Sequence, residues 1–168
     1  MNRRQTLLGL SALAGHVLFP RVLEAFVRAP QTPGAWRPEV LSAGQADTLA
    51  EVVETIIPTT DTPGARAARV PVFIDLALAH CVGRDERKTV LDALDRLGAA
   101  FASGSTAERE ARLSSMDPKA FGLLKEWTLL GYFTSEVGCT QALAYEAVPG
   151  EYKGCLDLRP GQRAWATR

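Results

Sequence analysis

The side chains that could do chemistry in this 168-residue chain are few and widely spaced. His80 and Cys81 are adjacent, but neighbouring positions on a helix point about 100° apart and chelate a metal poorly. A structural zinc site needs clustered Cys and His ligands, and the other histidine, His16, lies in the N-terminal leader. We therefore interpret His80 as a core or rim residue beside a buried thiol. The sequence contains no Cys-x-x-Cys-His haem motif, phosphate-binding glycine loop or dinucleotide fingerprint.

Two glutamates, Glu126 and Glu136, flank aromatic residues and could act as an acid–base pair. On one continuous helix their spacing would put them nearly three turns apart, which is too far to work together. We interpret each as a solvated or interface charge. Ser42 and Ser105 occupy helix-capping positions rather than those of nucleophiles. No constellation in the sequence carries a reaction, and we predict no catalytic, cofactor-binding or metal-binding residue in this chain.

The cysteines are Cys81, Cys139 and Cys155. In an oxidising compartment, a Cys139–Cys155 disulfide could join the last helix to the C-terminal arm. A pair of free thiols is the alternative, because the sequence does not define the distance between them. The odd count leaves at least one cysteine unpaired or bonded to a partner.

The N-terminus has the features of an export leader. Arg3 and Arg4 form a twin arginine, and Leu7 and Leu8 begin an apolar run that ends near residue 19. This pattern is typical of the twin-arginine (Tat) route, which exports folded proteins, so we expect the protein in the periplasm. The run is shorter than the ~20 residues that span a bilayer. A buried N-terminal helix with two incidental arginines is the alternative.

Composition and the positions of proline and glycine predict one domain after this leader. We expect a leader over residues 1–30, a proline-rich linker over 31–41 and a helical domain over 42–168. The formal net charge is zero and becomes slightly acidic without the leader. That balance argues against nucleic acid as a partner.

Apolar spacing predicts helices along most of the domain. Two capping boxes, Ser42 with Gln45 and Ser105 with Glu108, mark two helix starts, and Asp117 before Pro118 marks a third. The expected helices cover roughly 42–57, 71–83, 85–101, a short stretch from 105, a longer one from 117, and 135–145. From about residue 146, glycine and proline predict an irregular arm. The predicted fold is all-α, a small bundle of about five to six helices with an extended C-terminal arm.

Several short blocks resemble the gluconate 2-dehydrogenase subunit 3 family. The opening blocks are Ile57-Pro58-Thr59-Thr60-Asp61-Thr62-Pro63-Gly64-Ala65 and then Val70 with Phe73-Ile74-Asp75. The most distinctive block is Leu130-Gly131-Tyr132-Phe133-Thr134-Ser135-Glu136-Val137-Gly138. The closing block is Tyr145 with Val148-Pro149-Gly150-Glu151-Tyr152-Lys153-Gly154, followed by Arg163-Ala164-Trp165. The blocks occur in order over roughly residues 45–165.

This resemblance implies the small subunit of a periplasmic sugar or sugar-acid dehydrogenase. In such complexes a large flavoprotein of the glucose-methanol-choline oxidoreductase type holds FAD and the catalytic histidine, and electrons often leave through a cytochrome c. The small subunit carries the export signal for both chains. The resemblance thus implies an oxidoreductase complex whose FAD belongs to the partner, and which can be membrane-associated as a whole.

The distribution of aromatic residues independently favours a partner-binding role. Aromatic side chains gather in the last quarter of the chain, where regular structure is weak, and Tyr and Trp dominate interface energetics. Together with one glutamate, the interface candidates are Tyr132, Phe133, Glu136, Tyr145, Tyr152 and Trp165. The alternative is that these aromatics close a small core. Two other functions remain open, a periplasmic helical adaptor unrelated to redox chemistry and a self-sufficient helical enzyme.

Overall fold

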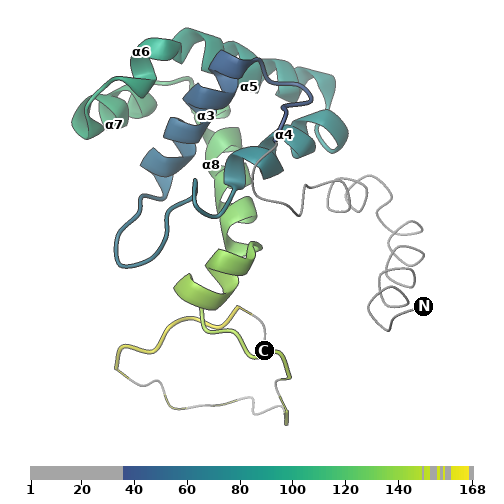
Figure 1. The fold of residues 1–168 in the computed structure, drawn as a ribbon, viewed down its shortest axis with the longest axis vertical. Coiled ribbons are helices and arrows are strands. Elements are labelled where there is room, and N and C mark those ends of the chain that lie inside the picture. Colours follow the sequence, from purple (N-terminus) through teal and green to yellow (C-terminus); the bar gives the residue numbers. More distant parts are fainter. Residues whose placement is uncertain (1–35, 149, 152–154, 156, 158–159, 167–168) are drawn as a thin grey trace.

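The structure, a computed structural model, describes residues 36–148, 150–151, 155, 157 and 160–166. Within them the chain is helical, and α8 runs down the middle of the fold (Figure 1). The elements are α3 (Ala43–Ile56), α4 (Val70–His80), α5 (Arg84–Leu97), α6 (Ala99–Ala102), α7 (Thr106–Ser114), α8 (Pro118–Phe133) and the π-helical turn η1 (Gly138–Ala142). The predicted all-α bundle is therefore confirmed. The leader residues Arg3, Arg4, Leu7 and Leu8 and the aromatic Tyr152 lie outside the described residues.

The predicted helix starts are confirmed by their hydrogen bonds. Ser42 Oγ accepts from the backbone N–H of Gln45 at 3.2 Å, and Gln45 Oε1 accepts from the backbone N–H of Ser42 at 2.9 Å. Ser105 and Glu108 form the same reciprocal pair at the start of α7. At α8 the Asp117 carboxylate accepts from the N–H of Ala120, and Pro118 is the first helical residue. These side chains satisfy backbone donors that have no partner inside the helix.

The expected helix over 85–101 is interrupted by Gly98, so it becomes α5 and α6. Gly98 has φ 59° and ψ −175°, a conformation that glycine adopts without the steric cost of a Cβ atom. After this break α6 carries Phe101 into the core, where it is fully buried.

The expected helix over 135–145 is shorter than predicted and includes the π-helical turn η1. Gly138 explains why the chain can turn here, because a Cβ at this position would overlap the carbonyl oxygen of Tyr132. Only glycine allows so close an approach to the end of α8.

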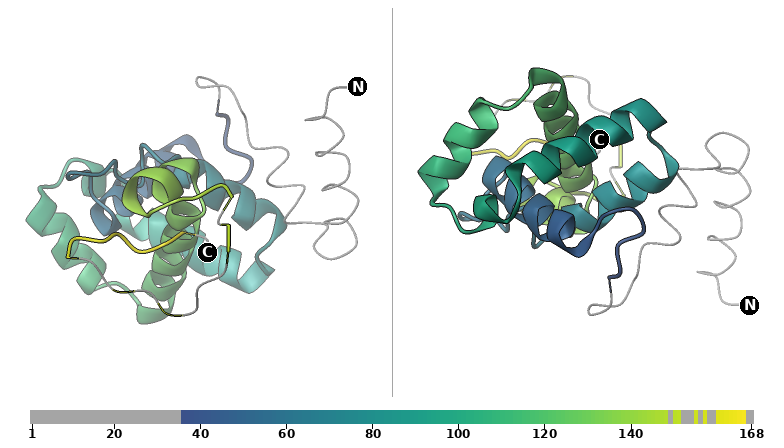
Figure 2. Two further views of the ribbon diagram at one scale, coloured as in Figure 1. Left: turned by 90° about the horizontal axis from the view of Figure 1, so that it is seen from below. Right: turned by 90° about the horizontal axis from the view of Figure 1, so that it is seen from above.

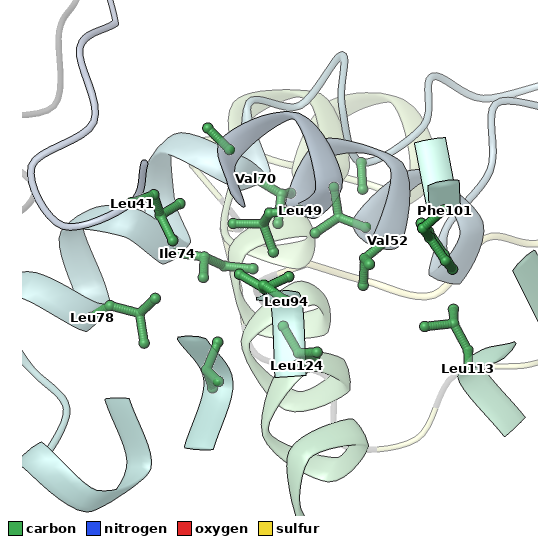
Figure 3. Packing of buried hydrophobic residues seen from close by; sticks show 14 of the residues in the cluster. Leu41, Leu49, Val52, Val70, Ile74, Leu78, Leu94, Phe101, Leu113 and Leu124 are labelled. Atoms are coloured by element: carbon green, nitrogen blue, oxygen red, sulfur yellow. The ribbon is translucent and has the colours of Figure 1, made fainter. Parts of the chain in front are cut away.

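The core lies where α3, α4 and α5 pack around the first part of α8 (Figure 3). Its side chains come from every helix of the bundle, and each fully buried aliphatic or aromatic residue contributes about 1.5–3 kcal/mol to stability. The buried residues include Leu49, Val52, Val70, Ile74, Leu78, Leu94, Phe101, Leu113 and Leu124. None of the helices in the described part of the chain is long and apolar enough to cross a membrane.

Gly131 allows α4 and α8 to approach closely. A Cβ at Gly131 would lie 2.6 Å from Cδ1 of Phe73 on α4. The Phe73 ring in turn packs against Trp127, with ring centroids 6.1 Å apart. The missing side chain at Gly131 therefore creates the space for Phe73 between the two helices.

We predict that Gly131→Ala destabilises the fold and that Gly122→Ala does not. The alanine methyl at 131 would force the Phe73 ring aside, and overpacking of this kind costs about 1–3 kcal/mol. Gly122 lies on the same helix, and a Cβ there would meet no atom within 4 Å, so alanine gains up to about 1 kcal/mol of helix propensity. Urea unfolding of both variants tests the contrast. Equal stability changes would show that Phe73 does not depend on Gly131.

Candidate functional site

Large exposed apolar side chains collect at one end of the molecule. They lie on the last part of α8 and on the C-terminal arm, which extend beyond the bundle in Figure 1. The residues are Leu129, Leu130, Phe133, Tyr145, Val148 and Trp165, and we call them the α8–arm surface. Large exposed apolar side chains that gather on one part of a protein surface are typical of sites of protein or ligand binding.

Two backbone hydrogen bonds and one side-chain hydrogen bond connect the arm to the end of the helical part. Ala144 N–H donates to Ala164 O, and Ala166 N–H donates to Ala144 O, both at 2.8 Å. Arg163 Nη1 donates to Gln141 O at 2.6 Å. The two backbone bonds form an isolated parallel bridge between Ala144 and Trp165. In the view from below (Figure 2, left), the described segments of the arm lie in front of the helices. The described residues from 145 to 165 are all exposed.

Tyr132, one of the interface candidates, is buried within this chain, so its side chain follows the alternative that the aromatic residues close the core. It is 2% exposed, and its hydroxyl donates to the carbonyl oxygen of Pro63 at 2.7 Å. The next residue, Phe133, is 42% exposed. Successive residues on a helix point in different directions, so only one of these two can face the core. Phe133, Tyr145, Trp165 and Glu136 are exposed, and their roles as partner contacts stay predictions.

The carboxylate of Glu54 accepts hydrogen bonds from the loop that joins α3 to α4. Oε1 accepts from the N–H and the hydroxyl of Thr59, at 2.9 and 2.7 Å, and Oε2 accepts from the N–H of Arg66 at 3.0 Å. Gly64 lies against this carboxylate, where a Cβ would overlap both oxygens. Partial burial acts to raise the pKa of Glu54, but the hydrogen bonds from Thr59 and Arg66 together lower it below its ordinary value.

A second carboxylate, Asp75 on α4, holds the segment that precedes the bundle. It is fully buried and accepts from the Trp36 indole N–H and from the backbone N–H groups of Glu39, Val40 and Leu41, at 2.8–3.3 Å. A carboxylate has about four acceptor sites, and these donors match that capacity. Asp75 therefore fixes residues 36–41 to α4.

In the described part of the chain, His80 and Cys81 lie at the edge of the fold. His80 Nε2 lies 2.9 Å from Glu39 Oε2 at the rim of the fold. Cys81 is exposed rather than buried as expected, and partial desolvation raises the pKa of its thiol. Among the described residues, no three or more His, Cys, Asp or Glu side chains are grouped as a metal site would require.

The Cys139–Cys155 disulfide is not formed. Both residues, like Cys81, are free thiols. The thiol of Cys139 instead donates to the carbonyl oxygen of Phe133 at 3.1 Å, so it faces back toward the end of α8. The structure thus has the second of the two alternatives left by the sequence.

Sequence reasoning did not single out Asp75 or Glu54 as important residues. A signal for Asp75 was present, because it is the one acidic residue in the otherwise apolar helix VPVFIDLALAH. An isolated acid in such a helix must find hydrogen-bond donors when it is buried. Glu54 offered no comparable signal, since its partners lie in a loop whose path the sequence does not define.

We predict that Glu54→Gln destabilises the fold at neutral pH and that the difference disappears in acid. A carboxyl whose pKa is lowered by folding adds stability above its ordinary pKa of 4.5. That stability is lost as the pH falls through the lower folded value. The expected difference is about 1 kcal/mol after allowance for solvent screening, measured by urea unfolding from pH 7 to pH 3. Glu110→Gln, at an exposed position on α7, controls for the loss of a carboxylate in general. A difference between Glu54→Gln and the parent that persists unchanged to pH 3 would contradict the assignment.

One of three comparisons with known proteins found a match. Comparisons with curated proteins and with solved structures found no significant match. The family model described as gluconate 2-dehydrogenase subunit 3 matches residues 43–150, from the first residue of α3 into the arm. The match includes the Glu54 loop, Asp75, all of α8 and the turn at Gly138. Because it covers more than half of the chain, this protein belongs to the gluconate 2-dehydrogenase subunit 3 family.

Proposed function

We propose that this chain is the non-catalytic small subunit of a periplasmic, FAD-dependent sugar or sugar-acid dehydrogenase. Membership of the family makes it a subunit of a multi-subunit dehydrogenase complex. The catalytic partner in this proposal is a large flavoprotein of the glucose-methanol-choline type. The small subunit stabilises that flavoprotein and carries the export address for both chains.

The observation that carries the proposal is the α8–arm surface. Burying Phe133, 42% exposed, and Tyr145, 53% exposed, against a partner would remove apolar area from water, which is the main driving force of association. Aromatic residues are also enriched at the energetic centres of interfaces. A subunit that must hold a larger protein needs such a surface, and an isolated helical domain does not.

The chemistry is assigned to the partner in this proposal. FAD and the catalytic histidine belong to the large subunit, and electrons pass from it to an acceptor such as a cytochrome c. The described acidic side chains of this chain that are most buried have structural partners. Asp75 holds residues 36–41, and Glu51 accepts from Arg109, which joins α3 to α7.

Export through one shared leader is consistent with these roles of the two subunits. The twin arginine at Arg3 and Arg4 would direct a folded protein through the Tat route. A flavoprotein acquires its FAD when it folds, so a bound pair that shares one leader can cross with the cofactor in place.

We predict that Phe133→Ala and Trp165→Ala weaken the complex without unfolding this chain. Both side chains are more than one-third exposed, so truncation should cost at most about 1.5 kcal/mol of folding stability, the edge contact between Phe133 and Tyr132 included. At an interface hot spot the same truncation costs about 2 kcal/mol or more of binding. The measurement is co-purification with the flavoprotein subunit, together with the thermal melt of the isolated variant.

Lys119→Ala is the matched control, because Lys119 is exposed at the opposite end of α8. It should melt and co-purify as the parent does. Full co-purification of both aromatic variants would show that the α8–arm surface is not the docking site. Failure of the parent chain to bind any flavoprotein would favour the helical adaptor instead.

We further predict that Arg3→Lys with Arg4→Lys retains both subunits in the cytoplasm, since one leader serves two proteins. Cell fractionation with antibodies to each chain makes the measurement. The control is Arg21→Lys with Arg28→Lys, which makes the same exchange outside the twin arginine. A flavoprotein that still reaches the periplasm with the first variant would rule out shared export.

A further inference from the structure

The exposed loop between α3 and α4 has a well-defined shape. Its base is closed by Ala65 N–H, which donates to Ile57 O at 3.0 Å, and its tip by Thr60 N–H, which donates to Thr62 O at 3.0 Å. Inside the loop, Thr59 Oγ accepts from the N–H of Gly64 at 3.1 Å. We call residues 58–64 the recognition loop.

The tip of the recognition loop faces solvent although hydrogen bonds connect the loop at its base and inside it. Residues 58–61 are exposed, and the hydroxyl of Thr60 donates to Oδ1 of Asp61 at 2.9 Å. Exposed loops with few contacts are the least stable parts of a fold. The hydrogen bonds of this one, with Glu54 beneath it, would reduce the entropy that a partner must remove on binding.

Tyr132 connects the recognition loop to the α8–arm surface. Its hydroxyl holds Pro63 O at 2.7 Å from one side. On the other side, its ring meets the ring of Phe133 edge-on, with centroids 5.2 Å apart and an interplanar angle of 83°. The loop and the exposed Phe133 are therefore both in direct contact with one buried side chain.

We propose that the recognition loop and the last turn of α8 form one recognition surface for the catalytic flavoprotein subunit. Phe133 and Leu130 enter an apolar recess of the partner, while Asp61 faces an arginine or lysine at the rim of that recess. Tyr132 is the positioning residue that keeps the two parts in register. This inference rests on the proposed function, because it adds a second element to the same interface.

The choice of partner for this surface rests on its continuity with the α8–arm surface and on the charge of Asp61. The proposed function puts a protein partner on the α8–arm surface, and Tyr132 contacts both Pro63 of the loop and Phe133 of that surface. A carboxylate at the rim of an apolar contact selects a cationic side chain opposite and steers association. The flavoprotein subunit is the partner that the proposed function provides.

The test measures the affinity and the salt dependence of the complex between the full chain and the flavoprotein subunit. Asp61→Asn should raise the Kd by about two- to five-fold at low salt, as expected for loss of an exposed ion pair. It should also flatten the fall in association rate with added salt. Asp47→Asn is the matched control, since Asp47 is exposed near the start of α3, roughly 15 Å along the helix from Ile57. It should leave both measurements unchanged.

Tyr132→Phe removes only the hydroxyl that holds Pro63. The isolated variant should lose no more than a few degrees of melting temperature, while its Kd for the flavoprotein rises. In the double variant with Asp61→Asn, the two effects should be less than additive, because Tyr132 acts through the position of the loop. A merely structural role for Tyr132 would instead give fully additive effects.

The outcomes separate this inference from the proposed function. If the parent binds the flavoprotein and Phe133→Ala weakens binding, but Asp61→Asn behaves as Asp47→Asn does, the loop is outside the interface and the inference is wrong. The proposed function would then still hold. If the parent does not bind the flavoprotein, both this inference and the proposed function are wrong. Should Tyr132→Phe fail to fold, Asp61→Asn decides alone.

Discussion

The buried side chain of Tyr132 makes the contacts on which the arrangement of the α3–α4 loop and the end of α8 depends. Its hydroxyl fixes the α3–α4 loop at Pro63, and its ring supports Phe133 on the outside. Its carbonyl oxygen accepts from the N–H and hydroxyl of Ser135, and Gly138 packs directly against it. Loop, helix end and the following turn therefore meet at one residue. A single aromatic side chain can do this because it combines a large apolar body with one polar atom at its tip.

The fold divides α8 between two tasks. Its first part is enclosed by α3, α4 and α5, with Leu124 and Thr128 buried. Its last turn exposes Leu130 and Phe133 beyond the bundle. The same helix therefore contributes to the buried core with its first part and to the exposed apolar surface with its last turn. The core provides the apolar burial that folding needs, and the apolar area left over is available to a partner.

Two buried or half-buried carboxylates shape the segments that leave the bundle. Asp75 gathers the N–H groups of residues 39–41 and the Trp36 indole, while Glu54 organises the loop before α4. In both, the carboxylate oxygen atoms accept hydrogen bonds from donors of the chain itself. Both lie in the region that the family model matches. Their hydrogen bonds indicate that these two polar residues stabilise the local structure of the chain.

The sequence by itself determined the features that depend on neighbours three or four residues away. The capping boxes at Ser42 and Ser105, the Asp117 cap and the all-α character follow from local hydrogen bonds and apolar spacing, and the ordered family blocks identified the family. Only the tertiary structure decided which of Tyr132 and Phe133 faces inward, that Gly131 admits Phe73, and that Cys139 remains a thiol. Tyr132 and Pro63 are 69 residues apart in the chain. Contacts of that range form only when helices pack, so no local pattern in the sequence encodes them.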